Sequence, residues 1–117
     1  MDIATAERAL VGFVASRCGL TVDAGVFRGQ LPPGTTGAAV RFVSGHGAGE
    51  DLAEFTAEVA AVFDEPGGAL GFAGALWNGL PVCNVAGFAR IAGTGEIALG
   101  FADGRYTVKG RLVAAFC

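Results

Sequence analysis

The stretch from Gly45 to Asp51 holds the residues best suited to do chemistry. It contains His46, the only histidine of the chain, and the acids Glu50 and Asp51. A histidine beside two carboxylates can act as a general base or as part of a metal site. A metal needs further ligands from elsewhere, however, and a general base needs an activated partner. Because the sequence shows no second polar cluster, we interpret His46 as a solvent-exposed loop residue.

The glycines of the same stretch stand between an expected strand and an expected helix, where phosphate-binding loops occur. A dinucleotide fingerprint would need glycine at Glu50, and a Walker loop would need lysine followed by serine or threonine. Glu50 and Asp51 instead place two negative charges where a phosphate would bind. We therefore favour a simple strand-to-helix connection. The alternative function is a small α+β ligand-binding domain or enzyme that uses the loop from Gly45 to Glu50.

The cysteines form no recognisable site. Cys18, Cys83 and Cys117 are odd in number and widely spaced, which is typical of neither a disulfide framework nor a zinc signature. Cys18 is expected at the C-terminal end of a helix, where the negative pole raises the pKa of a thiol. Cys83 is expected in an apolar strand as an inert buried thiol. We predict no catalytic residue, no cofactor and no metal, and a reducing compartment.

Basic residues gather near the C-terminus. Arg105, Lys109 and Arg111 alternate with apolar residues, so they share one strand face, on which their fields add. This face is either a solvated outer surface or a basic band that meets an acidic neighbour or nucleic acid. Trp77 stands beside a turn sequence and is expected in the core or at an interface, because large aromatic residues often anchor contacts.

The composition points to a covered apolar surface. The chain has 117 residues, of which 52% are hydrophobic and only 16% are charged. That length supports one domain with a real core. So few charges imply that something covers part of the apolar surface, and a partner subunit is the simplest cover. The net charge of −3 disfavours general nucleic-acid binding, which needs a basic field.

Two helices are predicted from apolar residues at helical spacing. The first covers residues 3–18, with Asp2 as its N-cap and Gly19 at its end. The second covers residues 51–64, where Asp51 and Glu54 have the spacing of a capping box.

Alternation with a period of two predicts the strands. The strongest signal is a C-terminal hairpin, residues 94–116, whose Asp103-Gly104 supplies the positive dihedrals of a tight turn. Its first strand places Ile97, Leu99 and Phe101 on one inward face. The other expected strands are a short pair within residues 20–30, then residues 38–44, 69–77 and 80–93, with Asn78-Gly79 as the turn between the last two and a further turn at residues 93–95.

The longest uncharged run, residues 66–89, is long enough to cross a bilayer. Its glycines, prolines and asparagines make it a poor membrane helix, so we interpret it as a pair of apolar strands. The expected order is thus helix, two or three short strands, helix and about four strands. This order predicts a single α+β domain over residues 1–117, with an antiparallel-dominated sheet, two helices on one face and a C-terminal β-hairpin.

The C-terminal stretch IALGFADGRYTVKGRLVAAF resembles the last strands of tail terminator, or minor capsid, proteins of long-tailed bacteriophages and prophages. The resemblance lies in an apolar strand, an Asp-Gly-Arg-Tyr turn and a final strand. Earlier, GQLPPGTTGAAVRF resembles the Leu-Pro loop and following strand of that family, and residues 51–64 resemble its central helix. Such proteins usually place two strands before that helix, of which one, residues 38–44, is clear here.

The resemblance implies a structural virion protein rather than an enzyme. It would be a subunit of a homo-oligomeric ring, commonly a hexamer, that caps the tail tube and joins it to head completion proteins. The implied partners are further copies of the chain and other tail and head–tail connector proteins, in the virion or in the cytoplasm of the bacterial host during assembly. Arg105, Lys109, Arg111 and Trp77 are then candidate interface or lumen residues, and a lumen face would meet DNA non-specifically. No membrane contact is expected.

Overall fold

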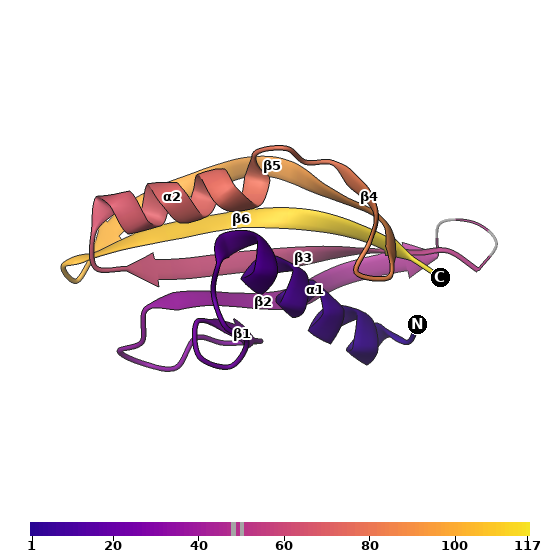
Figure 1. Cartoon of the computed structure of the whole chain (residues 1–117), viewed down its shortest axis with the longest axis horizontal. Helices are drawn as coiled ribbons and strands as arrows, with labels where there is room; N and C mark the ends of the chain where they lie inside the picture. Colours follow the sequence, from indigo (N-terminus) through magenta and orange to yellow (C-terminus); the bar gives the residue numbers. More distant parts are fainter. Residues whose placement is uncertain (48, 50) are drawn as a thin grey trace.

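The computed structural model describes every residue except Ala48 and Glu50. Within the described residues the chain forms two helices and six strands, in the order helix, three strands, helix, three strands (Figure 1). The elements are α1 (Ile3–Cys18), β1 (Val26–Arg28), β2 (Gly37–Gly47), β3 (Ala53–Phe63), α2 (Pro66–Trp77), β4 (Val82–Val85), β5 (Phe88–Ala102) and β6 (Arg105–Phe116).

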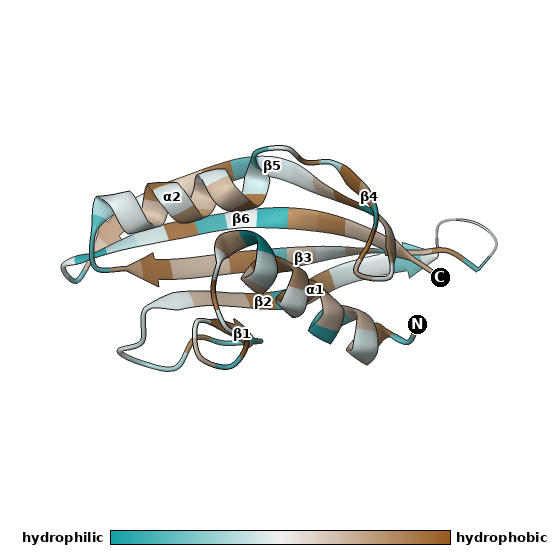
Figure 2. Ribbon diagram, viewed as in Figure 1, coloured by the Kyte–Doolittle hydropathy of each residue, from teal (hydrophilic) through white to brown (hydrophobic). Residues whose placement is uncertain are grey.

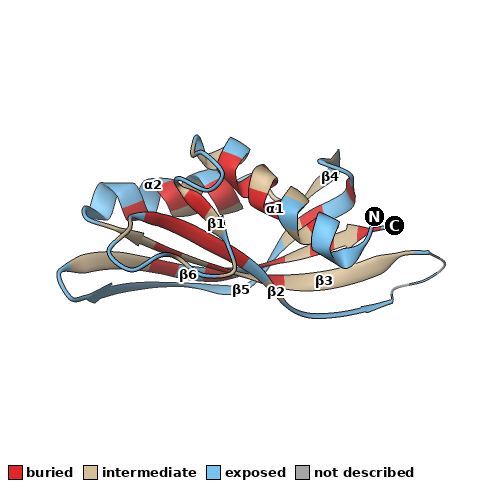
Figure 3. Ribbon diagram, turned by 90° about the horizontal axis from the view of Figure 1, so that it is seen from below, coloured by how far each residue is buried: buried red, intermediate tan, exposed pale blue. Residues whose placement is uncertain are grey.

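The described strands form one sheet in the order β1-β2-β3-β6-β5-β4. β1 pairs with β2 in parallel, and all the other neighbours are antiparallel. Both helices lie on one face of the sheet, and the opposite face is open (Figure 3). The predicted α+β class, the antiparallel-dominated sheet and the placement of both helices on one face are therefore confirmed.

The core lies between the helices and the sheet. Leu10 and Val14 of α1 belong to the same buried cluster as Val40, Val59 and Leu112 of the three central strands. Burying each such side chain stabilises the fold by about 1.5–3 kcal/mol. Each strand therefore has one apolar face toward the helices, and the ribbon of β6 alternates between brown and teal in Figure 2 as this requires.

Helix α1 has the bounds that its end signals predict. The Thr5 backbone N–H donates to Asp2 Oδ1 at 2.7 Å, which satisfies one of the free amides of the first turn. Gly19 adopts φ 68° and its N–H donates to the Ala15 carbonyl, so the helix ends in a left-handed residue.

The predicted helix over residues 51–64 is wrong, because this segment is β3, a central strand. Ala57, Val59 and Ala61 are buried toward the helices, while Glu54 and Glu58 stand at the alternate positions and are half-exposed. Alanines at both kinds of position hid this period of two, and the larger apolar residues happened to match a helical spacing. Pairing with both β2 and β6 decides the outcome, since tertiary context overrides local propensity.

The predicted strand over residues 69–77 is also wrong, because it lies within α2. Pro66 is in the first turn, where its missing N–H has no cost, and Ala69, Phe72 and Leu76 form the buried stripe. Asn78 caps the end of this helix, so Asn78-Gly79 does not join two strands. None of the described helices is long and apolar enough to cross a membrane.

The C-terminal hairpin is confirmed. Ala102 pairs with Arg105, and Asp103 and Gly104 adopt φ 52° and 73°, as a tight two-residue turn requires. The turn expected at residues 93–95 is absent, because β5 runs on through this region. Its register against β6 shifts between Thr94 and Ala98, which marks a β-bulge. The segment 80–93, expected as one strand, is instead β4 and the start of β5.

Candidate interaction surfaces

Part of the segment that the sequence singled out for chemistry lies in a strand. Gly45 and His46 belong to β2, and the next described element is the strand β3, which begins at Ala53. The expected connection from a strand to a helix is therefore wrong, and within the described residues no helix begins after this segment that could attract a phosphate with its N-terminus. The His46 imidazole is exposed, and its Nε2 lies 3.9 Å from Glu54 Oε1. Glu50, the other acid of the alternative site, lies outside the described residues.

The described part of the chain contains no group of three or more His, Cys, Asp or Glu residues arranged to hold a metal ion. None of its buried residues is polar or charged. A shallow hollow of about 440 Å³ lies beside α1, with Phe13 and Val85 in its wall. Its lining is mainly apolar, so it offers few groups that could orient a substrate.

Cys18 lies half-buried at the end of α1. Burial raises the pKa of its thiol to about 11, and the positive charge of the nearby Arg17 lowers that pKa by a smaller amount. The expectation of a raised pKa is confirmed, although burial rather than the helix pole is the main cause. Cys83 was expected to be buried, but it is exposed on β4 at the edge of the sheet, and Cys117 is exposed too.

The open face of the sheet carries a basic group of residues. Lys109 and Arg111 of β6 are exposed, while Val108 and Leu112, which precede and follow them, are buried on the helix side. This confirms the two predicted faces of β6. Register places further bases on the open face: Arg41 of β2 is opposite Glu58, which is opposite Arg111.

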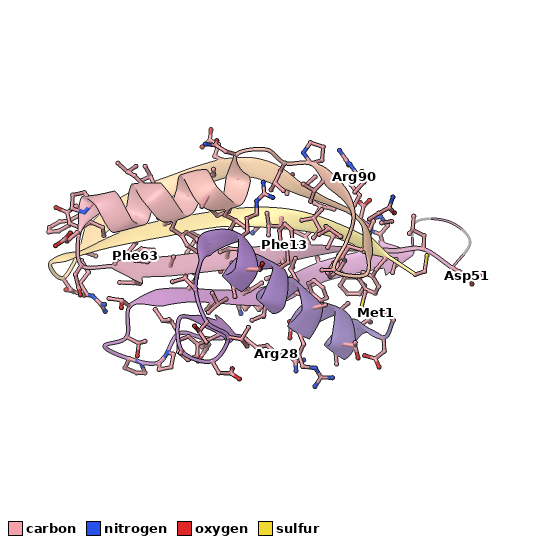
Figure 4. The ribbon with its side chains drawn as sticks, in the orientation of Figure 1. Met1, Phe13, Arg28, Asp51, Phe63 and Arg90 are labelled. Carbon is pink, nitrogen blue, oxygen red and sulfur yellow. The ribbon has the colours of Figure 1, made fainter. Side chains whose placement is uncertain are left out.

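Arg90 completes this group near the start of β5, where it pairs with Ala115 (Figure 4). We call Arg41, Arg90, Lys109 and Arg111 the basic face, within which Arg41 is paired with Glu58 through a guanidinium nitrogen 3.4 Å from Oε1. Sequence analysis missed Arg41 as a member because β3, the strand that joins it to β6, was taken for a helix. The alternation of β3 was the signal that could have revealed it.

Arg105 has a different role from the other bases of β6. Its Nε lies 3.1 Å from Asp64 Oδ1, and only 24% of its side chain is exposed. This ion pair joins the start of β6 to the residue that follows β3. Arg105 is therefore a local structural contact, whereas Lys109 and Arg111 remain available to a partner.

Trp77 lies at the end of α2 and packs on the sheet. Its Nε1 donates to the Arg111 carbonyl at 3.2 Å. The indole fills space above Gly93 and Gly110, where a Cβ would come within 2.9 and 2.5 Å of ring atoms. Of the two expectations for Trp77, core or interface, the structure places it in the helix–sheet packing, on the side away from the basic face.

The apolar residues of β5 that the sequence placed inside are exposed. Leu99 and Phe101 are 57% and 64% exposed, and Ile97 is 39% exposed. The reason is that β4 pairs with β5 only as far as Ile91, so the rest of β5 is the edge of the sheet. Leu70 of α2 is exposed beside them at 58%.

Leu70 and Leu99 line an apolar hollow of about 180 Å³ between α2 and the hairpin, together with Tyr106. The Phe101 ring lies 4.9 Å from the Tyr106 ring. We call Leu70, Leu99 and Phe101 the apolar shelf. It is a continuous exposed surface of the kind that marks protein interfaces.

No protein-family model matches this sequence, and a search of curated proteins finds no relative. The described residues therefore offer two surfaces from which function can be inferred, the basic face and the apolar shelf beside the free edge of β5.

Proposed function

We propose that this protein is a structural subunit of a homo-oligomeric ring at the end of a phage or prophage tail. It would be of the tail terminator or minor capsid type and join the tail tube to head completion proteins. The observation that carries the proposal is the apolar shelf beside an unpaired edge strand. A soluble monomer rarely exposes such a surface, whereas a ring subunit needs one to meet its neighbour.

The order of elements is compatible with the same proposal. Proteins of the resembled family usually place two strands before a central helix, and here the two long strands β2 and β3, with the three-residue β1 before them, precede α2. The segment first matched to the central helix, residues 51–64, is β3, so that part of the resemblance does not hold.

The basic face suggests which surface would line a lumen. Lys109 and Arg111 point away from the helices and are exposed, so they can approach phosphates without disturbing the core. The overall charge of −3 would keep such contact weak and non-specific, as passage of DNA through a channel requires. The face and the shelf lie on different sides of β5 and β6, so one chain can use both at once.

Native mass spectrometry over a range of concentrations, with negative-stain electron microscopy, tests the ring. We expect a discrete ring-sized species, or monomers that assemble as concentration rises. A strict monomer at every concentration would overturn the proposal, because the shelf would then have no partner of its own kind.

The lumen is tested separately with the double reversal Lys109→Glu and Arg111→Glu. We expect assembly to persist and binding to duplex DNA of random sequence at low salt to fall by about tenfold, since lost phosphate contacts weaken binding steeply. The single reversals Lys109→Glu and Arg8→Glu form a matched pair, because each removes one base and adds one acid and Arg8 is exposed on α1 on the helix side. Equal loss in both variants would show that net charge, and not this face, governs the contact.

A further inference from the structure

The free part of β5 is an edge built to accept another strand. Beyond the bulge, residues 98–102 read Ala-Leu-Gly-Phe-Ala and carry neither a charge nor a proline. Natural edges are usually protected by one of these. Because Ala102 and Arg105 form the closing pair of a two-residue hairpin, alternate residues of β5 turn their backbone groups outward. The backbone N–H and C=O groups of Leu99 and Phe101 thus face the position of a neighbouring strand. Their apolar side chains are exposed beside that position.

The opposite edge of the sheet is covered along part of its length. The Phe42 backbone N–H donates to Glu7 Oε2 of α1 at 2.8 Å, and Glu7 also pairs with Arg28 of β1. β1 itself pairs with β2 only as far as Val40. Beyond Phe42, the strand partners described for β2 residues 44–47 all belong to β3, and the register shift between Phe42 and Ser44 places Val43 in a β-bulge. The other side of this segment is left open. Val43 in this segment is 40% exposed.

We propose that the β5 edge, residues 98–102, pairs antiparallel with the β2 edge, residues 43–47, of a second copy of this chain. This inference rests on the proposed ring, for which it names the subunit interface. The two segments have equal length and lie toward opposite ends of the molecule (Figure 1). Since three antiparallel steps separate β2 from β5, the two strands run in opposite directions. A next copy in the same orientation therefore continues the sheet with antiparallel pairing.

Backbone geometry limits the register of this pairing. Residues directly opposite in an antiparallel pair either both turn their N–H and C=O groups toward each other or both turn them away. Leu99 and Phe101 turn theirs outward from β5, and the alternation carried across β6 and β3 makes Gly45 and Gly47 the outward residues of β2. Leu99 therefore lies opposite Gly45 or Gly47 of the next copy, and not opposite His46.

A single ladder between two such short segments is a small contact. Stable interfaces bury about 1,200–2,000 Å², so the apolar shelf must take part, with Leu70 and Leu99 covered by the incoming chain. Such an interface is heterologous: it closes into a ring when the rotation between copies fits, and otherwise continues as a filament. We therefore expect assembly that depends on concentration and involves both edges of every subunit.

The test uses one lysine on each edge of the full chain. Leu99→Lys disables the β5 edge and Val43→Lys disables the β2 edge, and both positions are exposed, so folding should persist by circular dichroism. Ile3→Lys on α1, at a site 53% exposed, is the matched control. We expect each edge variant alone to be monomeric by native mass spectrometry at concentrations where the wild type and Ile3→Lys assemble. Should Leu99→Lys misfold, Phe101→Lys replaces it.

An equimolar mixture of the two edge variants gives the decisive result. Each retains the edge that the other lacks, so the mixture should form a species of two chains, one of each kind, and nothing larger. Assembly of both variants alone would overturn the interface while leaving the ring itself in place. Assembly of Val43→Lys alone would mean that β5 meets another surface and would overturn the head-to-tail pairing. A monomeric wild type would overturn both the interface and the ring.

Discussion

The close packing of Trp77 on Gly110 makes Gly110→Ala a sharp probe of the helix–sheet interface. The new methyl group would come 2.5 Å from Cζ2 and 2.9 Å from Cη2 of the indole, well inside van der Waals contact. Gly110 is buried in β6 between two paired strands, so the backbone has little freedom to move. The indole must therefore shift, and its hydrogen bond to the Arg111 carbonyl would lengthen or break.

The expected magnitude follows from three contributions. Overpacking a core costs about 1–3 kcal/mol, and loss of the hydrogen bond adds about 0.5–1.5 kcal/mol. Alanine offsets about 0.5–1 kcal/mol because it restricts the unfolded chain more than glycine does. We expect Gly110→Ala to lower the free energy of unfolding by about 0.5–4 kcal/mol.

Urea unfolding monitored by Trp77 fluorescence and circular dichroism measures this change, at a concentration where the chain is monomeric. Gly12→Ala in α1 is the control, because a Cβ there would meet nothing within 4 Å. This control should stabilise the protein by about 0.5–1 kcal/mol, as alanine is the better helix former. If Gly110→Ala is as stable as the wild type, Trp77 does not lie tightly on this strand and the reasoning is refuted.

Three further outcomes are expected. Hydrogen bonding by Thr5 lowers the pKa of Asp2 below its ordinary value of 3.8, so the capped helix is stabilised above that pH. The melting-temperature difference between wild type and Asp2→Asn should therefore shrink as pH falls through the lowered pKa, and a constant difference would contradict the cap. Arg105→Ala should cost no more than about 1 kcal/mol in urea unfolding, because its partner Asp64 is largely exposed. In single-cysteine variants at pH 8, alkylation of Cys18 should be at least about tenfold slower than that of Cys83 by mass spectrometry, since burial raises its pKa to about 11.

Local signals predicted the elements whose ends are set by their own residues. Asp2 and Gly19 bound α1 through a side-chain cap and a left-handed residue, and both interactions involve neighbours in sequence. Asp103-Gly104 likewise determines the hairpin turn by its backbone preference. The fold class could be predicted because these elements and the overall order of helices and strands were enough to define it.

The middle of the chain could not be predicted in the same way, because small residues carry little periodic signal. β3 contains four alanines, and α2 contains four glycines within its bounds. An alanine is compatible with either face, and glycine is unfavourable in helix and strand alike. Local preference did not distinguish helix from strand in these two segments. The pairing of β3 on both sides made it a strand, and the packing of Phe72 and Leu76 beneath α2 made that segment a helix.

The candidate surfaces show a different limit. Alternation assigned Lys109 and Arg111 to one face of β6 correctly, because a strand's period fixes which residues share a side. The same reasoning placed Leu99 and Phe101 on an inward face, yet both are exposed. Period two identifies a face but not what covers it, and coverage depends on how far β4 and α2 reach along β5. An apolar strand face that its own chain leaves uncovered has the same sequence pattern as a buried one. Such a pattern is expected when a second copy of the chain covers the face.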